Sequence, residues 1–283
     1  MSLYRAAAAA ALVLAIAACS AAPASVASPS QSPIPTGGPP VTAAPGGPAE
    51  LQVYGAASLK AVLAKVKEAY ELANPGITLN ISTDSSAALE TKIEQGAPAD
   101  VFLSADTAGP QKLVDAGLAT GGVVKIAGNV LTVIVPVGNP AKIASPADLA
   151  RPGVKVIAAG DAVPITKYAA KLIEDLAALA GYPTGFASAY AANIVSREDS
   201  AGAVAAKIAL GEGDAAIVYA TDAVASGKVE NVAVPAGANV PATYGGVALA
   251  RSKFAQATST FLAWLTGAEG QAVFAGFGFL PGK

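Results

Sequence analysis

The chain has 283 residues, of which 53% are hydrophobic, so it can bury the core of one large domain or of two modest ones. Its formal net charge is −2 and it has no basic run, which argues against binding to nucleic acid. It contains no histidine and one cysteine, Cys19, which excludes Ser-His-Asp and Cys-His catalysis, histidine-based metal sites and intrachain disulfides. We therefore expect a protein that is not an enzyme.

The N-terminus has the pattern of an export signal. Arg5 precedes an apolar run over 6–18 that is shorter than the roughly 20 residues of a membrane span. The run ends in Ile16-Ala17-Ala18-Cys19, which resembles the cleavage site of a bacterial lipoprotein. We expect residues 1–18 to be a lipoprotein signal peptide and Cys19 to be the lipidated N-terminus of the mature protein. The alternative is an ordinary signal peptide followed by an incidental cysteine.

Residues 19–48 are rich in proline, serine and glycine and carry no charged side chain. Such a composition cannot bury a core and favours an extended chain. We expect this segment to be a disordered tether, with a pro-segment or a glycosylated stalk as the alternative.

The folded part begins with an extended run that turns through Gly55-Ala56-Ala57 into an amphipathic helix over 58–71. These small residues would let the backbone approach a ligand, and the N–H groups and positive dipole of the helix would attract an anion. Ser58 would add a hydroxyl. The alternative is that Ser58 serves only as the N-cap.

A second corner follows the same logic, since a strand over 77–81 leads through Thr83-Asp84-Ser85-Ser86 into a helix that ends at Gly96. A carboxylate at Asp84 would repel an anion, and we expect it to cap the helix instead. Asp100 and Asp106 flank a short apolar strand. We interpret them as turn and capping residues rather than as a catalytic pair.

The rest of the chain continues to alternate strands and helices, which predicts an α/β fold with parallel sheets and leaves the number of lobes open. The capping-box spacing of Thr266 and Glu269 predicts the start of the last helix. The other predicted strands cover 129–137, 154–159, 215–219 and 245–250, and the other helices begin at Ser145 and Thr221 or cover 166–180, 200–210 and 253–265.

Four motifs in this order resemble the molybdate-binding solute-binding proteins of ABC transporters. The motifs are Ala56-Ala57-Ser58-Leu59, 96–106, Gly128-Asn129-Val130-Leu131 and 216–223.

The resemblance implies the two-lobed type II periplasmic-binding-protein fold with the ligand cleft between the lobes. Lobe 1 would comprise 49–128 with 241–283, and lobe 2 would comprise 129–240. It further implies that the protein, anchored by its lipid at the outer face of the cell membrane, binds molybdate and tungstate without a cofactor and delivers them to a membrane permease. A receptor for sulfate, phosphate or another small oxyanion is the alternative. A secreted enzyme and an adhesive lipoprotein are weaker alternatives from other classes.

The resemblance also implies the ligands of the oxyanion. The hydroxyls of Ser58, Ser86 and Tyr219 correspond to those of the family, and two backbone N–H groups fall near Ile165 and Ser200. Ile165 departs from the family pattern, because small residues are usual there, and Ser200 would add a hydroxyl or serve only as an N-cap. Since no side chain with an ordinary pKa titrates between pH 6 and 8, we expect nearly constant affinity across that range.

Overall fold

The computed structural model describes residues 47–282. The predicted signal peptide, the predicted lipid site at Cys19 and most of the predicted tether lie outside these residues. In the part of the chain that is described, no helix is both long and apolar enough to cross a bilayer.

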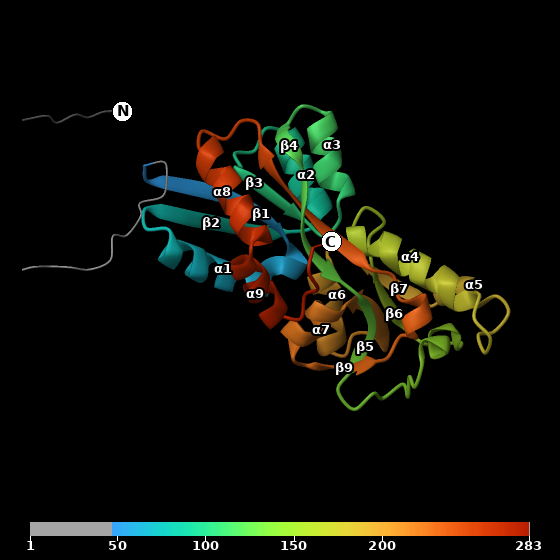
Figure 1. Cartoon of the computed structure of the whole chain (residues 1–283). Coiled ribbons are helices and arrows are strands. Elements are labelled where there is room, and N and C mark those ends of the chain that lie inside the picture. Colours follow the sequence, from blue (N-terminus) through green and yellow to red (C-terminus); the bar gives the residue numbers. More distant parts are fainter. Residues whose placement is uncertain (1–46, 283) are drawn as a thin grey trace, which may run out of the picture. The chain divides into compact units, whose positions relative to one another are not determined.

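Residues 47–282 contain two five-stranded sheets, and the first has the strand order β2-β1-β3-β10-β4 (Figure 1). Strand β1 pairs in parallel with β2 and β3, whereas β10 is antiparallel to both β3 and β4. Its strands are β1 (Ala49–Ala56), β2 (Ile77–Asp84), β3 (Val101–Ser104), β4 (Ala119–Asn129) and β10 (Ala242–Leu249). The helices that connect or cover them are α1 (Lys60–Ala73), α2 (Ser86–Glu94), α3 (Ala108–Asp115), α8 (Ala255–Thr266) and α9 (Ala268–Gly276).

The second sheet has the order β7-β6-β8-β5-β9, in which β6 is parallel to β7 and β8 while β5 is antiparallel to β8 and β9. Its strands are β5 (Leu131–Pro136), β6 (Val156–Ala159), β7 (Ile194–Glu198), β8 (Ala215–Tyr219) and β9 (Val229–Val232). Its helices are α4 (Pro164–Ala177), α5 (Phe186–Ala192), α6 (Ala201–Ala209) and α7 (Ala220–Ser226). Three short 3-10 helices cover Ala57–Leu59, Pro146–Ala150 and Ala236–Ala238.

The expectation of parallel sheets is confirmed for four strand pairs and wrong for the rest, because each sheet also contains antiparallel strands at the places where the chain crosses between them. The first crossing leads from β4 through Val130 directly into β5, and the second leads back into β10. Asn239 joins the two crossings: its Oδ1 accepts the backbone N–H of Leu131 at 3.0 Å, and its Nδ2 donates to the carbonyl of Leu131 at 2.9 Å. The two crossings between the sheets are therefore hydrogen-bonded side by side.

Helix α1 buries the apolar face that its spacing predicts, with Val62, Leu63, Val66 and Tyr70 in the core. This packing explains Gly55, because a Cβ there would lie 2.3 Å from Cδ1 of Leu63. The small size of Gly55 therefore admits a core leucine, and not a ligand as the sequence suggested.

The last helix begins one residue later than predicted. Gly267 is the N-cap of α9, while the hydroxyl of Thr266 donates to the carbonyls of Leu262 and Ala263 at the end of α8. Glu269 accepts the indole N–H of Trp264 at 2.7 Å. The predicted capping box is wrong, because both of its side chains bond to the preceding helix.

Candidate functional site

A small cavity lies between the two sheets and is bounded by residues of both. Its volume is about 10 Å³, which is the lower limit for holding one water molecule. All five residues that the sequence singled out for ligand binding line this cavity. The complete lining is Ala56, Ala57, Ser58, Ser85, Ser86, Ala105, Val163, Pro164, Ile165, Ser200, Ala201 and Tyr219.

Four helix N-termini meet at this cavity. The 3-10 helix that leads into α1 contributes Ser58, α2 contributes Ser86, α4 contributes Ile165, and α6 contributes Ala201. The first four N–H groups of a helix have no partner within the helix, and the helix dipole gives this end a partial positive charge. Two helices that pack on each sheet therefore direct N–H donors and positive potential towards one point. This arrangement favours the binding of an anion.

The serine hydroxyls of the first sheet are oriented by donors from behind. Oγ of Ser58 accepts the phenol O–H of Tyr244 at 3.0 Å, and Oγ of Ser86 accepts the backbone N–H of Ala105 at 3.1 Å. A hydroxyl that already accepts a hydrogen bond still has its own proton to donate. Ser58 and Ser86 can thus both act as donors towards the cavity.

The second sheet contributes one serine in the same manner and one tyrosine whose hydroxyl proton already has an acceptor. Ser200 is the N-cap of α6, where its Oγ accepts the N–H of Ala203 at 3.2 Å, and it also lines the cavity. The N-cap role and the predicted lining role therefore hold together. Tyr219, the last residue of β8, is 1% exposed and donates its hydroxyl to the carbonyl of Ala105 across the cavity at 3.5 Å.

At the N-terminus of α4, Ile165 is buried against the cavity, and its bulk narrows the space there. The neighbouring Thr166 does not contribute a hydroxyl to the lining. Its Oγ1 donates instead to the carbonyl of Gly160 at 2.7 Å, which ties the start of α4 to the preceding loop.

None of the residues within 47–282 that line the cavity carries a formal charge. Asp84, which stands just before the lining serines, accepts the ammonium of Lys92 at 2.7 Å, and this hydrogen bond lowers the pKa of its carboxyl. The prediction that Asp84 caps α2 is wrong, because Ser85 is the N-cap. Asp106 accepts the N–H of Gly109 at 3.1 Å and so caps the first turn of α3, as predicted.

A hydrogen-bond chain behind Ser58 was missed by sequence reasoning. Buried Asn129 donates its Nδ2 to Oγ1 of Thr221 at 2.8 Å and to the hydroxyl of Tyr244 at 3.3 Å, and Tyr244 in turn donates to Ser58. Asn129 and Thr221 stand within the motifs singled out above, but nothing in the sequence places Tyr244 beside Ser58.

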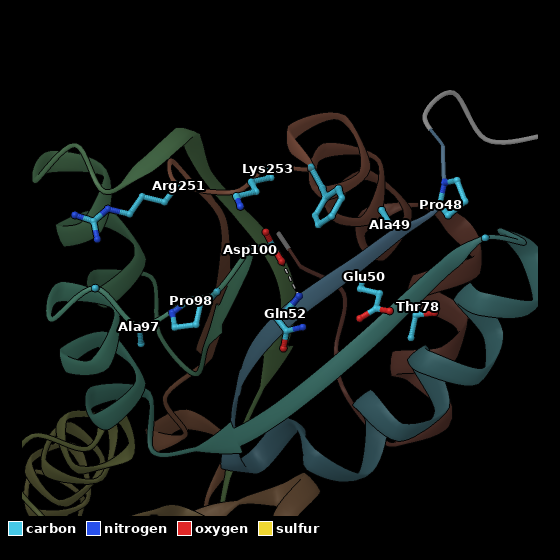
Figure 2. A pocket seen from close by; sticks show the side chains of 14 residues that line it. Pro48, Ala49, Glu50, Gln52, Thr78, Ala97, Pro98, Asp100, Arg251 and Lys253 are labelled. Atoms are coloured by element: carbon cyan, nitrogen blue, oxygen red, sulfur yellow. Dashed lines mark hydrogen bonds between the residues drawn. The ribbon is translucent and has the colours of Figure 1, made fainter. Parts of the chain in front are cut away.

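A larger groove, about 770 Å³ on the same measure, lies elsewhere on the first sheet, where β1 begins (Figure 2). Figure 2 shows Asp100 accepting the backbone N–H of Gln52, at a distance of 2.7 Å, with Arg251 and Lys253 on the loop that follows β10. The groove is open, is lined by charged side chains of both signs, and contains none of the residues predicted to bind a ligand.

Comparison with known proteins agrees with this geometry. Residues 51–280 match the family model of the bacterial extracellular solute-binding proteins. The molybdate-binding protein ModA of Mycobacterium tuberculosis (strain H37Rv) is 35% identical over 240 residues, which cover 83% of this chain and 87% of that protein.

Two solved structures have the same fold. The substrate-binding domain of a putative molybdenum ABC transporter from Clostridium difficile has a TM-score of 0.63 at 26% identity, and the match covers 83% of this chain and 99% of that one. The sulfate-binding protein SubI from Mycobacterium tuberculosis H37Rv has a TM-score of 0.73 at 22% identity, covering 82% of this chain and 86% of that one. The predicted type II periplasmic-binding-protein fold and the predicted resemblance are confirmed. The relatives are solute-binding proteins rather than enzymes, and this chain belongs to the family of bacterial extracellular solute-binding proteins.

Proposed function

We propose that this protein binds molybdate outside the cytoplasm and delivers it to the permease of an ABC importer. The observation that carries the proposal is the convergence of Ser58, Ser86, Ile165, Ser200 and Tyr219 on one cavity with four helix N-termini and no charged side chain. The 35% identity to a molybdate-binding protein supports molybdate as the ligand. Tungstate has nearly the same shape and the same charge, and we propose that it binds at the same site.

Neutral donors are sufficient to hold a tetrahedral dianion. A hydrogen bond to a charged group contributes about 1.5–3 kcal/mol, so six or seven of them can overcome desolvation and reach a nanomolar dissociation constant, which corresponds to about −12 kcal/mol. Ser58, Ser86 and Ser200 each keep a hydroxyl proton to donate, and the helix N-termini supply further N–H groups. Without a cation in the site, selectivity depends on the size that the cavity takes when the lobes close around an anion.

The division into lobes gives the binding step its motion. We propose that 49–128 with 241–283 form lobe 1 and that 129–240 form lobe 2. Ser58 and Ser86 then belong to lobe 1, while Ile165, Ser200 and Tyr219 belong to lobe 2. An anion held by both sets of donors draws the lobes together about the hinge at Asn129.

Isothermal titration calorimetry tests the ligand and the site together. The wild-type protein should bind molybdate in the presence of excess sulfate or phosphate. Ser58→Ala and Ser86→Ala each remove one donor and should weaken binding by about 1.5–3 kcal/mol, or roughly tenfold to a few hundredfold. Ser259→Ala is the matched control, because Ser259 is exposed on α8 and does not line the cavity, and it should bind like the wild type.

Tighter binding of sulfate or phosphate than of molybdate would assign the site to another oxyanion. Equal affinities for the cavity variants and the Ser259→Ala control would show that the anion binds elsewhere.

We also propose that the mature protein is anchored through a lipid on Cys19. One acyl chain gives only marginal membrane binding, so stable attachment needs several chains. When Cys19→Ala protein is expressed in a bacterium that processes lipoproteins, it should appear in the soluble fraction of the cell envelope or in the medium. Complete retention of the variant in the membrane fraction would rule out this anchor.

A further inference from the structure

Asp222 is a buried carboxyl group that neither the fold nor the proposed ligand set explains. It is the third residue of α7 and is 6% exposed. The backbone N–H of Tyr219 lies close enough to its carboxyl to lower the pKa of that group. One carboxyl oxygen, Oδ2, is buried and has no hydrogen-bond partner anywhere in residues 47–282. A buried carboxylate oxygen without a donor is unfavourable, whereas a neutral carboxyl is tolerated far better.

Two short connections join Asp222 to the cavity. The first is direct, because the carboxyl lies beside the backbone N–H of Tyr219, and the phenol of Tyr219 lines the cavity. The second runs through its neighbour Thr221, which accepts from Asn129, and continues through Tyr244 to the hydroxyl of Ser58. Asp222 thus lies three residues from Tyr219 and one residue from a hydrogen-bond chain that ends at the hydroxyl of Ser58.

Among residues 47–282, no cation pairs with the carboxyl of Asp222. The titratable groups that face it are the phenols of Tyr219 on β8 and Tyr244 on β10. The elements packed against α7 are α6, β5, β8 and β9. Lys207 on α6 pairs with Glu198 at 2.9 Å, Glu230 on β9 is exposed and accepts from Gly138, and β5 carries no charged residue. Lys228, in the turn after α7, is exposed.

Burial therefore controls the protonation of this group. It raises the pKa of Asp222 to about 7, and the hydrogen bond from Tyr219 lowers the pKa by less than burial raises it. The carboxyl is mostly neutral at pH 6 and mostly charged at pH 8.

We propose that Asp222 couples anion binding to proton uptake, so that the cavity holds its dianion with Asp222 protonated and releases it more readily when Asp222 is ionised. This inference rests on the proposed function of the cavity. A carboxylate directly behind Tyr219 would repel a dianion through a medium of low dielectric constant, where charges interact strongly. Bound anion and Asp222 charge therefore disfavour each other, and by linkage anion binding takes up a proton in each molecule whose Asp222 is ionised beforehand.

The proposal replaces the expectation of constant affinity between pH 6 and 8. That expectation considered only side chains with ordinary pKa values. Asp222 titrates inside the window because of where the fold buries it, which the sequence does not reveal.

Calorimetric titration of the full chain with sodium molybdate tests the coupling. The dissociation constant should rise about tenfold between pH 6 and pH 8, the limit set by ionising one group near pH 7. At pH 7, titrations in two buffers of different ionisation enthalpy should show uptake of about half a proton per anion. Asp222→Asn keeps the shape and can still accept from Tyr219, so it should bind with nearly constant affinity across the range and without proton uptake.

Asp100→Asn is the matched control. Asp100 is buried like Asp222, at 8% exposed, but its carboxyl accepts hydrogen bonds from Gln52 and Ser252 away from the cavity. It should keep the pH dependence of the wild type. Molybdate binding without proton uptake, or a pH dependence that survives in Asp222→Asn, overturns the coupling and leaves the proposed function intact. Absence of molybdate binding at every pH overturns the proposed function itself. If Asp222→Asn does not fold, proton uptake by the wild type still decides the matter.

Discussion

The cavity between the lobes and the groove beside β1 differ in size, charge and construction. The groove is far larger, at about 770 Å³ against about 10 Å³, and Glu50, Asp100, Arg251 and Lys253 line it. The cavity has no charged side chain, but it receives the N-termini of two helices from each sheet. A large charged groove with both signs has no preference for an anion, whereas a small neutral cavity filled with donors does.

The difference teaches that the proposed anion site is built from secondary structure rather than from charged side chains. Helix N-termini supply fixed N–H groups, and hydroxyls oriented from behind supply the rest. Charge added to the two regions should therefore have very different effects.

The largest effect is expected from a negative charge placed in the cavity. Ser86→Asp puts a carboxylate among donors that face a dianion, and like charges brought together cost several kcal/mol. Molybdate affinity should fall at least about a thousandfold in calorimetric titration. Thr78→Asp, which places the same charge at the rim of the groove, should leave the affinity unchanged. A similar loss in both variants would remove the distinction between the two regions.

Closure of the lobes should give the next largest effect. Ligand bound only by the folded state stabilises it by about 4 kcal/mol at a thousandfold excess over the dissociation constant. Saturating molybdate should therefore raise the melting temperature and reduce the radius of gyration in X-ray scattering. Apart from Pro48, the groove is lined only by residues of the proposed lobe 1, so an occupant there would not change the radius of gyration or the angle between the lobes. An unchanged scattering radius with saturating molybdate would contradict closure.

The buried carboxyl should make stability depend on pH. Because the pKa of Asp222 is raised on folding, its contribution to stability is complete below the pKa of the unfolded chain and is lost as the pH rises towards 7. Unfolding by denaturant at pH 5 and pH 8 should show a loss of about 2–3 kcal/mol that Asp222→Asn lacks. Three other carboxyls have a lowered pKa, so their contribution to protein stability is lost only at more acidic pH and does not affect this comparison. They are Glu71, Asp84 and Glu198.

The smallest effect is expected from lysines near the cleft. Lys60 is exposed, and Lys167 is 66% exposed with its Nζ 3.8 Å from Oδ2 of Asp106, so neither faces the anion. Lys60→Gln and Lys167→Gln should each change molybdate affinity by well under about 1 kcal/mol, since exposed ion pairs contribute little. A loss larger than that of Ser58→Ala would mean that a cation, and not the hydroxyls, holds the ligand.

Sequence reasoning succeeded where the information was local. The corners at Ser58 and Ser86 each follow a strand and open a helix, and periodicity alone places both features. Strand β8 covers the predicted 215–219, because five apolar residues in a row between turn signals indicate a buried strand. The convergence of Ile165 and Ser200 on the same cavity came from the family resemblance, which orders the motifs along the chain.

Sequence reasoning failed where the structure depends on distant pairs. Tyr244 and Ser58 are 186 positions apart, and no pattern links them. The antiparallel place of β10 likewise depends on how the chain returns from the second sheet. The role of Asp84 was misread because its partner Lys92 is one of several lysines in the region. The burial of Asp222 is a property of the packed hinge and has no local signal.

The hinge also has an optical consequence. Tyr168, Tyr219, Tyr244 and Phe279 form a row from α4 through β8 and β10 to the C-terminal segment, with successive ring centroids 6.2, 5.5 and 5.5 Å apart. Aromatic rings at such spacing couple their electronic transitions, so the near-ultraviolet circular dichroism of tyrosine reports small rotations between the lobes. The single tryptophan, Trp264 on α8, packs against Tyr70 on α1, and its indole N–H donates to Glu269 on α9. We therefore expect anion binding to change the tyrosine dichroism and to leave the tryptophan fluorescence unchanged.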